Sequence, residues 1–380
     1  MAIGRRPGSQ PNKGTRMITT DRKRRLIAAM AEQGIDVLVA YGNAWQGDYL
    51  RYVADFGLLE GQGIAVVRDG EITLYLDSML EVERAQVESP ALTVVHAPNL
   101  IADVEQVMER AGNARIGAGP YSLLPRRLAA RAKDLRLSNE TAFFDKLLMN
   151  KLQSEVDAIR NACRLADEGY EVFKNAARPG RADYELIAEI EAFYRARGVD
   201  DNFMIIGVGG PEVRGMAPPS GKRMKKGDLV TTELTPCVDG YYAQICRTLV
   251  LGEPSEAQLT AFGVYKEAME AGIATVKAGV LSSDVARAEN DVFRKHDLGI
   301  YVTNEYTRVR GHGVGLFADT KPQLLEDIHI TLETGMTIIV HPNTYNPNVG
   351  YMVLGDVVAV TDTGHELFTR TPRELIRVAV

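Results

Sequence analysis

The second half of the chain alternates long amphipathic helices with short apolar strands, and this order restricts the folds that the sequence can adopt. A helix is predicted to begin near Ser154, because apolar side chains recur from there at helical spacing. Further helices are predicted over residues 183–197, from Ser255 and from Ser283. Strand-like segments lie at residues 229–234, 240–245, 336–341 and 357–361. An antiparallel sheet covered by helices on one face, which is an α+β arrangement, accounts for this order.

The first half has a more compact alternation of strands and helices, which is typical of a small α/β domain. Residues 37–41 form an apolar run typical of a buried strand. Two further strands, at residues 63–67 and 72–76, flank an Asp-Gly pair that favours a tight hairpin. The basic, polar start of the chain lacks the apolar core of a signal peptide. The predicted organisation is a flexible tail at residues 1–17, an α/β domain at 18–147 and a larger domain at 148–380.

The composition is that of an ordinary soluble globular protein, with 45% hydrophobic and 25% charged residues. A net charge of −6 gives no electrostatic reason to expect nucleic acid or an anionic membrane as a partner. No apolar run is long enough to span a bilayer. The three cysteines make no disulfide framework, so a reducing, cytoplasmic location is expected.

Several motifs follow one another in the second half of the chain. The first is GDLVTTE at residues 227–233, followed by DGYYAQICRT at 239–248. The later ones are GHGVGL at 311–316, GMTIIVHP at 335–342 and a strand-and-turn segment at 350–364. In order, they resemble the GDLVxxD…DGYxxDxTRT, HGIGL and GMxxxxEP motifs and the final hairpin of the creatinase and Xaa-Pro dipeptidase family.

This resemblance covers about residues 150–370 and carries an expectation about the fold. It implies a C-terminal pita-bread domain, in which helices cover an antiparallel sheet, preceded by a smaller α/β domain of the creatinase type. It also implies a homodimer. Fold alone does not settle function, so the expected function depends on the residues of the site.

The positions that hold metal in the family's peptidases are altered in this chain. Those peptidases bind two divalent ions with two Asp, one His and two Glu, a set of ligands that suits an activated water. The resemblance places Glu233, Gln244, His312, His341 and Gly355 at the five positions. Four carboxylates are thereby reduced to one, and two buried cations would remain largely uncompensated. From the sequence we therefore expect neither a dinuclear metal site nor any other cofactor.

Three more positions depart from the family pattern. Met216 takes the place of a His that peptidases and creatinase share, and Asp319 replaces the second His of the peptidases. Cys246 stands where creatinase keeps a Glu before its Arg-Thr pair. Glu233 and His341 also resemble residues of ectoine hydrolase-like members, which resemble creatinase in working without metal and use a Glu nucleophile on a small ring amidine.

The residues of the predicted site have chemical and purely structural interpretations. Glu233 ends an apolar stretch, so burial is expected to raise its pKa and make it a base or nucleophile, unless an arginine pairs with it. His312 lies between glycines and His341 ends an apolar strand, and both are candidates for proton transfer. His341 also fits a hydrogen-bonded core histidine. Cys246 is either a thiolate nucleophile or a small buried filler.

A second group of residues is predicted to bind substrate. Gln244 offers a neutral amide that can orient a substrate or a water. Trp45 and Arg51 belong to a polar and aromatic cluster after the first strand, and the resemblance implies that this region reaches the partner subunit's pocket. A packed loop is the alternative for them. The predicted substrate-binding residues are Gln244, Asp319, Met216, Cys246, Trp45 and Arg51.

The leading hypothesis from the sequence is a metal-independent hydrolase that cleaves a C–N bond in a small polar amidine, guanidine, lactam or amide. Glu233 is the expected base or nucleophile, and His312 and His341 transfer the proton. The first alternative is a mononuclear metal enzyme, a hydrolase or lyase, that uses these same three residues as ligands. The others are a non-catalytic binding protein on a peptidase scaffold and an Xaa-Pro peptidase.

Overall fold

The computed structural model describes residues 13–380, and the described chain divides into two compact units. One unit ends at Leu148 and the other spans Met149–Val380. Residues 1–12, which hold most of the predicted tail, lie outside the described residues. The remaining part of that predicted tail, residues 13–17, belongs instead to the first helix, α1 (Lys13–Gln33). Across residues 13–380, no helix has both the length and the apolar character needed to cross a membrane.

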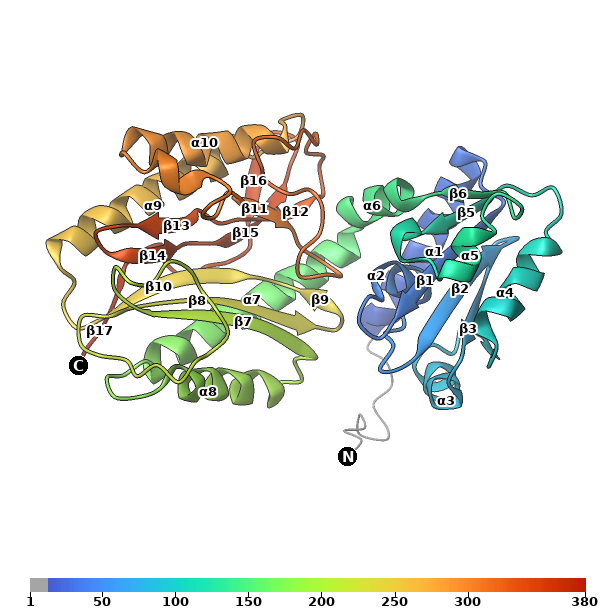
Figure 1. The fold of residues 1–380 in the computed structure, drawn as a ribbon, viewed down its shortest axis with the longest axis horizontal. Helices are drawn as coiled ribbons and strands as arrows, with labels where there is room; N and C mark the ends of the chain where they lie inside the picture. The colour runs from blue at the N-terminus through green and yellow to red at the C-terminus, as the bar shows by residue number, and fades with distance from the viewer. Residues whose placement is uncertain (1–12) are drawn as a thin grey trace. The chain divides into compact units, whose positions relative to one another are not determined.

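The N-terminal unit is built on a mixed sheet with the strand order β4-β3-β2-β1-β5-β6 (Figure 1). Its strands are β1 (Val37–Asn43), β2 (Gln62–Arg68), β3 (Glu71–Leu76), β4 (Thr93–His96), β5 (Ile116–Gly119) and β6 (Leu137–Asn139). The predicted hairpin joins β2 to β3. Its turn residues Asp69 and Gly70 have φ values of 53° and 77°, which is the left-handed pair that a tight hairpin of this kind requires.

Helices flank this sheet and contribute to its core. They are α1, α2 (Asp48–Ala54), α3 (Met79–Glu88), α4 (Leu100–Glu109), α5 (Arg126–Ala130) and α6 (Thr141–Met149), with a 3₁₀ turn at Tyr121–Leu123. The buried apolar side chains of β1, among them Val37 and Val39, pack in one cluster with Val104 and Met108 of α4. The apolar run of β1 therefore forms the buried strand that its sequence predicts.

The C-terminal unit contains antiparallel strands arranged in several connected sheets. One sheet has the order β17-β10-β8-β7, with β9 paired to β8, a second has the order β11-β12-β15-β16, and β13 pairs with β14. An isolated bridge between Cys246 and Gly355 connects the first sheet to the second. The strands are β7 (Asp201–Gly209), β8 (Leu229–Val238), β9 (Tyr241–Tyr242), β10 (Ile245–Leu251), β11 (Gly311–Gly313), β12 (Thr337–Val340), β13 (Asn343–Asn346), β14 (Gly350–Val353), β15 (Asp356–Val360), β16 (His365–Leu367) and β17 (Ile376–Val378).

Two pairs of long helices pack against these strands, and Figure 1 shows the strands between the pairs. The helices are α7 (Gln153–Ala176), α8 (Asp183–Arg195), α9 (Glu256–Thr275) and α10 (Ser282–Lys295), with a 3₁₀ turn at Gly299–Val302. Helix α7 contacts β8 and β10, and α9 contacts β12 and β14. Apolar side chains such as Tyr265, Phe293 and Ile338 fill the core between the second pair and the strands.

The predicted strand at residues 240–245 differs from the structure. It is divided into the short β9 and the longer β10, and Gln244 lies in the link between them. The register of β9 and β10 against β8 is continuous, and the break lies opposite Pro236, which accepts from the Ala243 N–H but has no N–H of its own to donate.

Candidate functional site

Glu233 lies in the middle of β8, directly opposite Cys246 of the antiparallel strand β10. The Cys246 thiol lies 3.9 Å from Glu233 Oε2 and donates to it. From the link before β10, Gln244 Nε2 donates to Cys246 Sγ over 3.7 Å. Side chains two residues apart on an extended segment point to the same side, so Gln244 and Cys246 share a face. Both are buried.

Partial burial gives the Glu233 carboxyl group unusual acid–base properties. Desolvation raises its pKa to about 7, although hydrogen bonds from Gln244, Thr235 and Cys246 oppose the rise. The negative charge of Asp319 raises the pKa further. Among residues 13–380, Glu233 forms no ion pair with Lys or Arg, so the arginine-paired alternative does not describe it. A carboxyl group of this pKa can accept a proton near neutral pH.

Two histidines face each other at the paired strands β11 and β12. His312 is in the middle of β11, and His341 directly follows β12. Their ring centroids are 5.3 Å apart, at an interplanar angle of 67°. Burial keeps the pKa of His341 well below its ordinary value, and the positive charge of Arg310 adds to this effect. His341 is therefore neutral at neutral pH.

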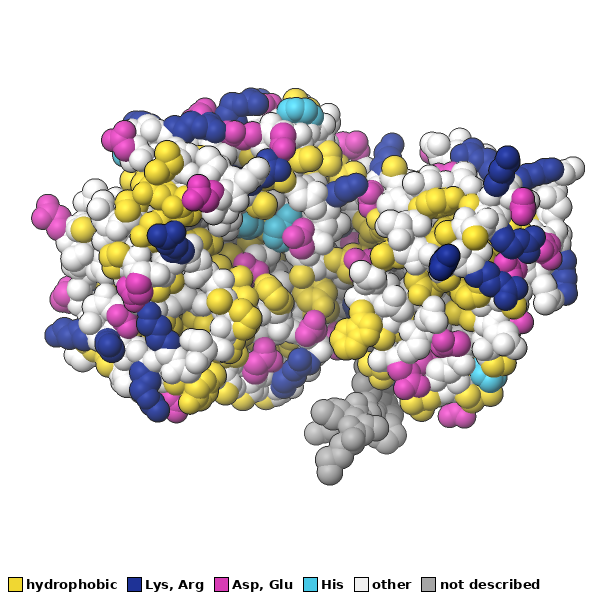
Figure 2. All heavy atoms as spheres, in the orientation of Figure 1, with side chains coloured by type: hydrophobic (Ala, Val, Ile, Leu, Met, Phe, Trp, Pro, Cys, Tyr) yellow, Lys and Arg dark blue, Asp and Glu magenta, His cyan; other side chains and the backbone are white. Residues whose placement is uncertain are grey.

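Further contacts connect the histidines to the Glu233 side of the site. Asp319 Oδ1 is 3.7 Å from His312 Nδ1, and the same carboxylate acts on the pKa of Glu233. Figure 2 shows histidine side chains in a recess on the visible face of the C-terminal unit. We call the set Glu233, Gln244, Cys246, His312 and His341 the Glu233 site.

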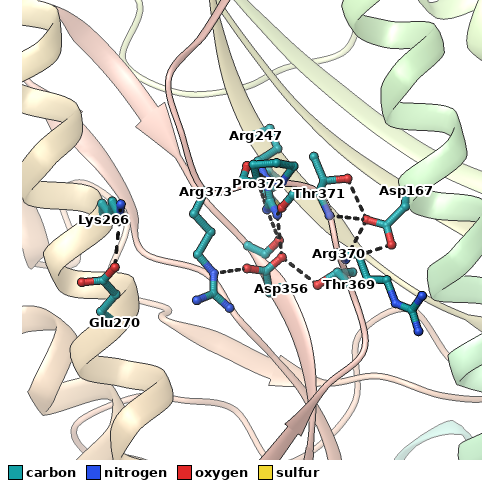
Figure 3. Close-up of polar contacts among 12 residues, drawn as sticks. Asp167, Arg247, Lys266, Glu270, Asp356, Thr369, Arg370, Thr371, Pro372 and Arg373 are labelled. Carbon is teal, nitrogen blue, oxygen red and sulfur yellow. Dashed lines mark hydrogen bonds and ion pairs between the residues drawn. The ribbon is translucent and has the colours of Figure 1, made fainter.

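Behind this site, a buried carboxylate and two arginines fix the backbone of the neighbouring strands (Figure 3). Asp356 accepts hydrogen bonds from Arg247 Nη2 at 2.7 Å, Arg373 Nε at 2.5 Å and Thr369 Oγ1 at 2.7 Å. Arg247 also donates to the carbonyl oxygens of Cys246 and Gly355. We call the set Asp356, Arg247, Arg373 and Thr369 the Asp356 cluster. Arg247 is therefore structural.

Gly355 allows β15 to approach β10 closely. A Cβ atom at residue 355 would lie 2.8 Å from Cys246 Sγ and 3.0 Å from His341 Cβ, so a side chain there requires its neighbours to move. Backbone hydrogen bonds run in both directions between Cys246 and Gly355. The glycine thus brings the Cys246 side of the site into contact with the His341 side.

The remaining residues that the sequence singles out are placed as follows. Met216 is partly buried in the loop between β7 and β8, beside the bridge of Ile206 with Ala217. Trp45 and Arg51 belong to the N-terminal unit. Trp45 is 94% exposed in the loop after β1, and Arg51 is partly buried in α2. Their predicted role in substrate binding therefore stays a prediction.

Three residues near the Glu233 site are absent from the sequence prediction. Tyr351 of β14 is buried, and burial raises the pKa of its phenol, with a further contribution from the negative charge of Glu233. Arg310 and Asn343 are also buried, and both contact the segments that carry the histidines. Two features of the sequence point to these residues: Arg310 is a charged residue directly before the GHG segment, and Asn343 is an amide two residues after His341.

Comparison with known proteins identifies the class of protein. The model of Metallopeptidase family M24 matches residues 157–362. An Xaa-Pro dipeptidase from Pyrococcus furiosus is 26% identical over 322 residues, covering 83% of this chain and 89% of its own length. A creatinase from a Bacillus species is 25% identical over 386 residues, covering 93% and 90%. The solved structure of an Xaa-Pro dipeptidase from Bacillus anthracis aligns with a TM-score of 0.80 at 26% identity, covering 94% of this chain and 99% of that one.

The chain belongs to Metallopeptidase family M24. The predicted relationship to creatinase and the Xaa-Pro dipeptidases is confirmed, and so is the α+β class with a pita-bread domain after a smaller domain. The leading functional prediction is wrong. A metal-independent hydrolase of amidines, guanidines or lactams is contradicted by membership of a metallopeptidase family and by relatives named as Xaa-Pro dipeptidases. These findings favour the Xaa-Pro peptidase alternative.

The metal centre that the family name implies can be compared with the residues of this site. Only Glu233 offers a carboxylate among the five corresponding positions, Gln244 Nε2 is directed at a thiol, and a side chain at Gly355 would collide with Cys246 and His341. In the described part of the chain, no group of three or more His, Cys, Asp or Glu side chains is placed to hold a metal ion. The residues present therefore do not fit a two-metal centre, and Glu233, His312 and His341 do not form the three-ligand set of the mononuclear alternative.

Proposed function

We propose that this chain hydrolyses the C–N bond of a small peptide of the Xaa-Pro type at the Glu233 site. The enzyme class follows from the family, whose peptidases and creatinase are hydrolases of C–N bonds. The substrate class is supported by relatives named as Xaa-Pro dipeptidases, which align over most of both chains. The proposed catalytic domain is residues 148–380, and the division of the structure at Leu148 supports that boundary.

The observation that carries the proposal is a partly buried Glu233 whose pKa of about 7 suits a base at neutral pH. In the proposed reaction, Glu233 accepts a proton from the water that attacks the carbonyl carbon. The new C–O bond forms, the C–N bond breaks, and the histidine side of the site passes the proton that Glu233 accepted on to the leaving nitrogen. Gln244 orients the substrate or the water through its amide, and Asp319, Met216 and Cys246 line the space around it.

The test is the release of proline from a panel of Xaa-Pro dipeptides, followed by mass spectrometry, with and without added Mn²⁺. Ala-Ala serves as the matched peptide without proline, and the Glu233→Gln variant controls for contaminating peptidases. Release of proline that requires Glu233 is expected. Cleavage of Ala-Ala at an equal rate would contradict the assignment of Xaa-Pro substrates. Proline release that persists in Glu233→Gln would show that the reaction does not take place at the Glu233 site.

A homodimer and a cytoplasmic location remain part of the proposal. Trp45 is 94% exposed, and a partner subunit that covers it would account for such a large apolar side chain at the surface. Light scattering after size exclusion should give twice the chain mass for the wild-type protein and a smaller mass for Trp45→Ala. The location is supported by Cys163 and Cys246, which are buried and form no disulfide with another described residue.

A further inference from the structure

Asn343 connects a buried arginine to one histidine of the Glu233 site. Arg310 Nη1 donates to Asn343 Oδ1 over 2.9 Å, and Asn343 Nδ2 lies 3.0 Å from His341 Nδ1. All three side chains are buried, Arg310 completely. Their contacts are therefore made to one another instead of to solvent.

The donor and acceptor roles in this chain of contacts can be assigned from the arginine. A guanidinium group has only donors, so the Asn343 atom that faces Arg310 must be the amide oxygen. The atom that faces His341 is then the NH₂ group, which only donates. His341 Nδ1 must accept, so it carries no proton, and the neutral ring carries its proton on Nε2.

The arginine cannot turn to accommodate the opposite arrangement. Arg310 Nε donates to Asn290 Oδ1 over 2.5 Å, and Nη2 donates to the Thr307 carbonyl oxygen over 2.6 Å. Nη1 also donates to the carbonyl oxygen of Asn343 itself over 2.8 Å. These contacts fix the guanidinium plane and, through it, the orientation of the Asn343 amide.

His312 has the opposite arrangement of protons. Its Nδ1 lies 3.0 Å from the Gly313 carbonyl oxygen and 3.7 Å from Asp319 Oδ1, and both of these atoms are acceptors when Asp319 is ionised. Nδ1 therefore carries the proton and Nε2 has a free lone pair. The two facing rings thus differ, because one Nε2 donates and the other accepts.

We propose that Arg310 and Asn343 are positioning residues that hold His341 in the Nε2–H form. His341 then donates a hydrogen bond to the carbonyl oxygen of the amide whose C–N bond is cleaved, and His312 offers an accepting nitrogen. The tautomer follows from the contacts alone, whereas the role of the hydrogen bond rests on the proposed function. A fixed donor directed at the oxygen that becomes negative stabilises the transition state. A nitrogen that carries a proton has no lone pair for a metal ion, so Nε2 of His341 acts as a donor and not as a ligand.

The tautomer can be measured without any substrate. The full chain contains six histidines, so labelling with ¹⁵N-histidine gives a simple long-range ¹H–¹⁵N spectrum, in which His341→Gln assigns the His341 signals. For the wild-type protein, we expect the unprotonated nitrogen of His341 at Nδ1. A wild-type spectrum with the proton on Nδ1 overturns the proposal, whether or not any variant folds.

The isosteric Asn343→Asp variant tests what fixes the tautomer. A carboxylate between Arg310 and His341 only accepts, so the His341 proton should move to Nδ1 and Nε2 should lose its proton. Asn346→Asp is the matched control on the same strand, because the Asn346 oxygen already accepts a hydrogen bond from the Asn348 amide and an Asp can do the same. An unchanged His341 spectrum in Asn343→Asp, or a switch in Asn346→Asp, contradicts the proposal.

Kinetics separate this inference from the proposed function. If dipeptides are cleaved, Asn343→Asp should lower kcat by about 10²–10³-fold with little change in KM, as loss of one donor to the developing oxyanion does. Equal kcat values for Asn343→Asp and Asn346→Asp would show that the hydrogen bond from His341 to the substrate has no catalytic role. If no dipeptide is cleaved, the proposed function fails, and the spectra still decide the tautomer.

Discussion

Glu233 and Asp356 are two carboxyl groups in neighbouring parts of one set of sheets, and their pKa values are shifted in opposite directions. Glu233 is only partly buried, yet its pKa is raised to about 7. Asp356 is 1% exposed, yet its pKa is lowered from its ordinary value. The more deeply buried group is therefore the one that remains ionised.

The partners of each group explain this difference. Desolvation raises the pKa of both carboxyl groups, but Arg247 and Arg373 compensate the charge of Asp356. Around Glu233 the partners are an amide, a hydroxyl and a thiol, which only partly offset desolvation, and Asp319 adds a negative charge. Burial thus raises the pKa of a carboxyl group only where no cation pairs with it, and under the proposed function Glu233 serves catalysis while Asp356 serves structure.

The largest effect should come from removing the base. Glu233→Gln keeps the shape and hydrogen-bonding capacity of the side chain but cannot accept the proton. We expect kcat/KM for a cleaved Xaa-Pro dipeptide to fall by about 10²–10⁴-fold. The control is Glu305→Gln, an exposed glutamate that should stay within about twofold of the wild type. Comparable losses in the two variants would show that the Glu233 carboxylate has no special role.

The second effect concerns the structural carboxylate. Asp356→Asn removes the charge that compensates Arg247, which is fully buried, and should lower the free energy of unfolding by about 3–5 kcal/mol. Urea denaturation followed by circular dichroism measures this loss. Asp239→Asn is the control, because this exposed residue has a φ of 50° that Asn also adopts readily. A loss of less than about 1 kcal/mol for Asp356→Asn, as expected for a surface pair, would contradict the comparison.

The third effect is a pH dependence of stability at Glu233. The pKa in the folded state, about 7, exceeds the ordinary value of 4.5, so the folded protein binds this proton more tightly than the unfolded chain. This contribution to stability is complete below pH 4.5 and is lost as the pH rises to about 7. Glu233→Gln has no such loss, so its stability relative to the wild type should increase over this range by at most about 3 kcal/mol. A constant difference between pH 4.5 and 8 would show that the pKa is not raised.

The smallest effect should come from the thiol beside the base. Burial and the negative charge of Glu233 keep the pKa of Cys246 well above its ordinary value, so the group remains a protonated donor. Because this hydrogen bond lowers the pKa of Glu233, Cys246→Ala should move the acidic limb of the pH–rate profile slightly toward higher pH. Activity should stay within about tenfold of the wild type, since a thiolate nucleophile is not involved. Loss of all turnover in Cys246→Ala would restore the thiolate alternative, and an unshifted limb in an active variant would contradict the effect of this hydrogen bond.

The sequence predicts the family and the fold because both depend on local patterns. The motifs at residues 227–248, 311–316 and 335–342 keep their order and spacing, and each corresponds to a strand or turn of the structure. The hairpin between β2 and β3 likewise follows from its Asp-Gly pair. The enzyme class, a hydrolase of C–N bonds, is also predicted correctly, but the metal-independent function is wrong, because altered ligand positions do not by themselves remove a chain from a metallopeptidase family.

The sequence by itself determined which residues approach the centre of the C-terminal unit, among them Glu233, His312 and His341. Only the tertiary structure decided the chemical state of those residues. No acidic residue near Arg247 in the sequence identifies its partner. In the folded chain Arg247 pairs with Asp356, and among the described residues Glu233 has no Lys or Arg as a partner. In the same way, Arg310 and Asn343 are 33 residues apart, and their contact sets the proton position on His341. Proton affinities and tautomers depend on contacts between distant segments, and a one-dimensional pattern does not contain those contacts.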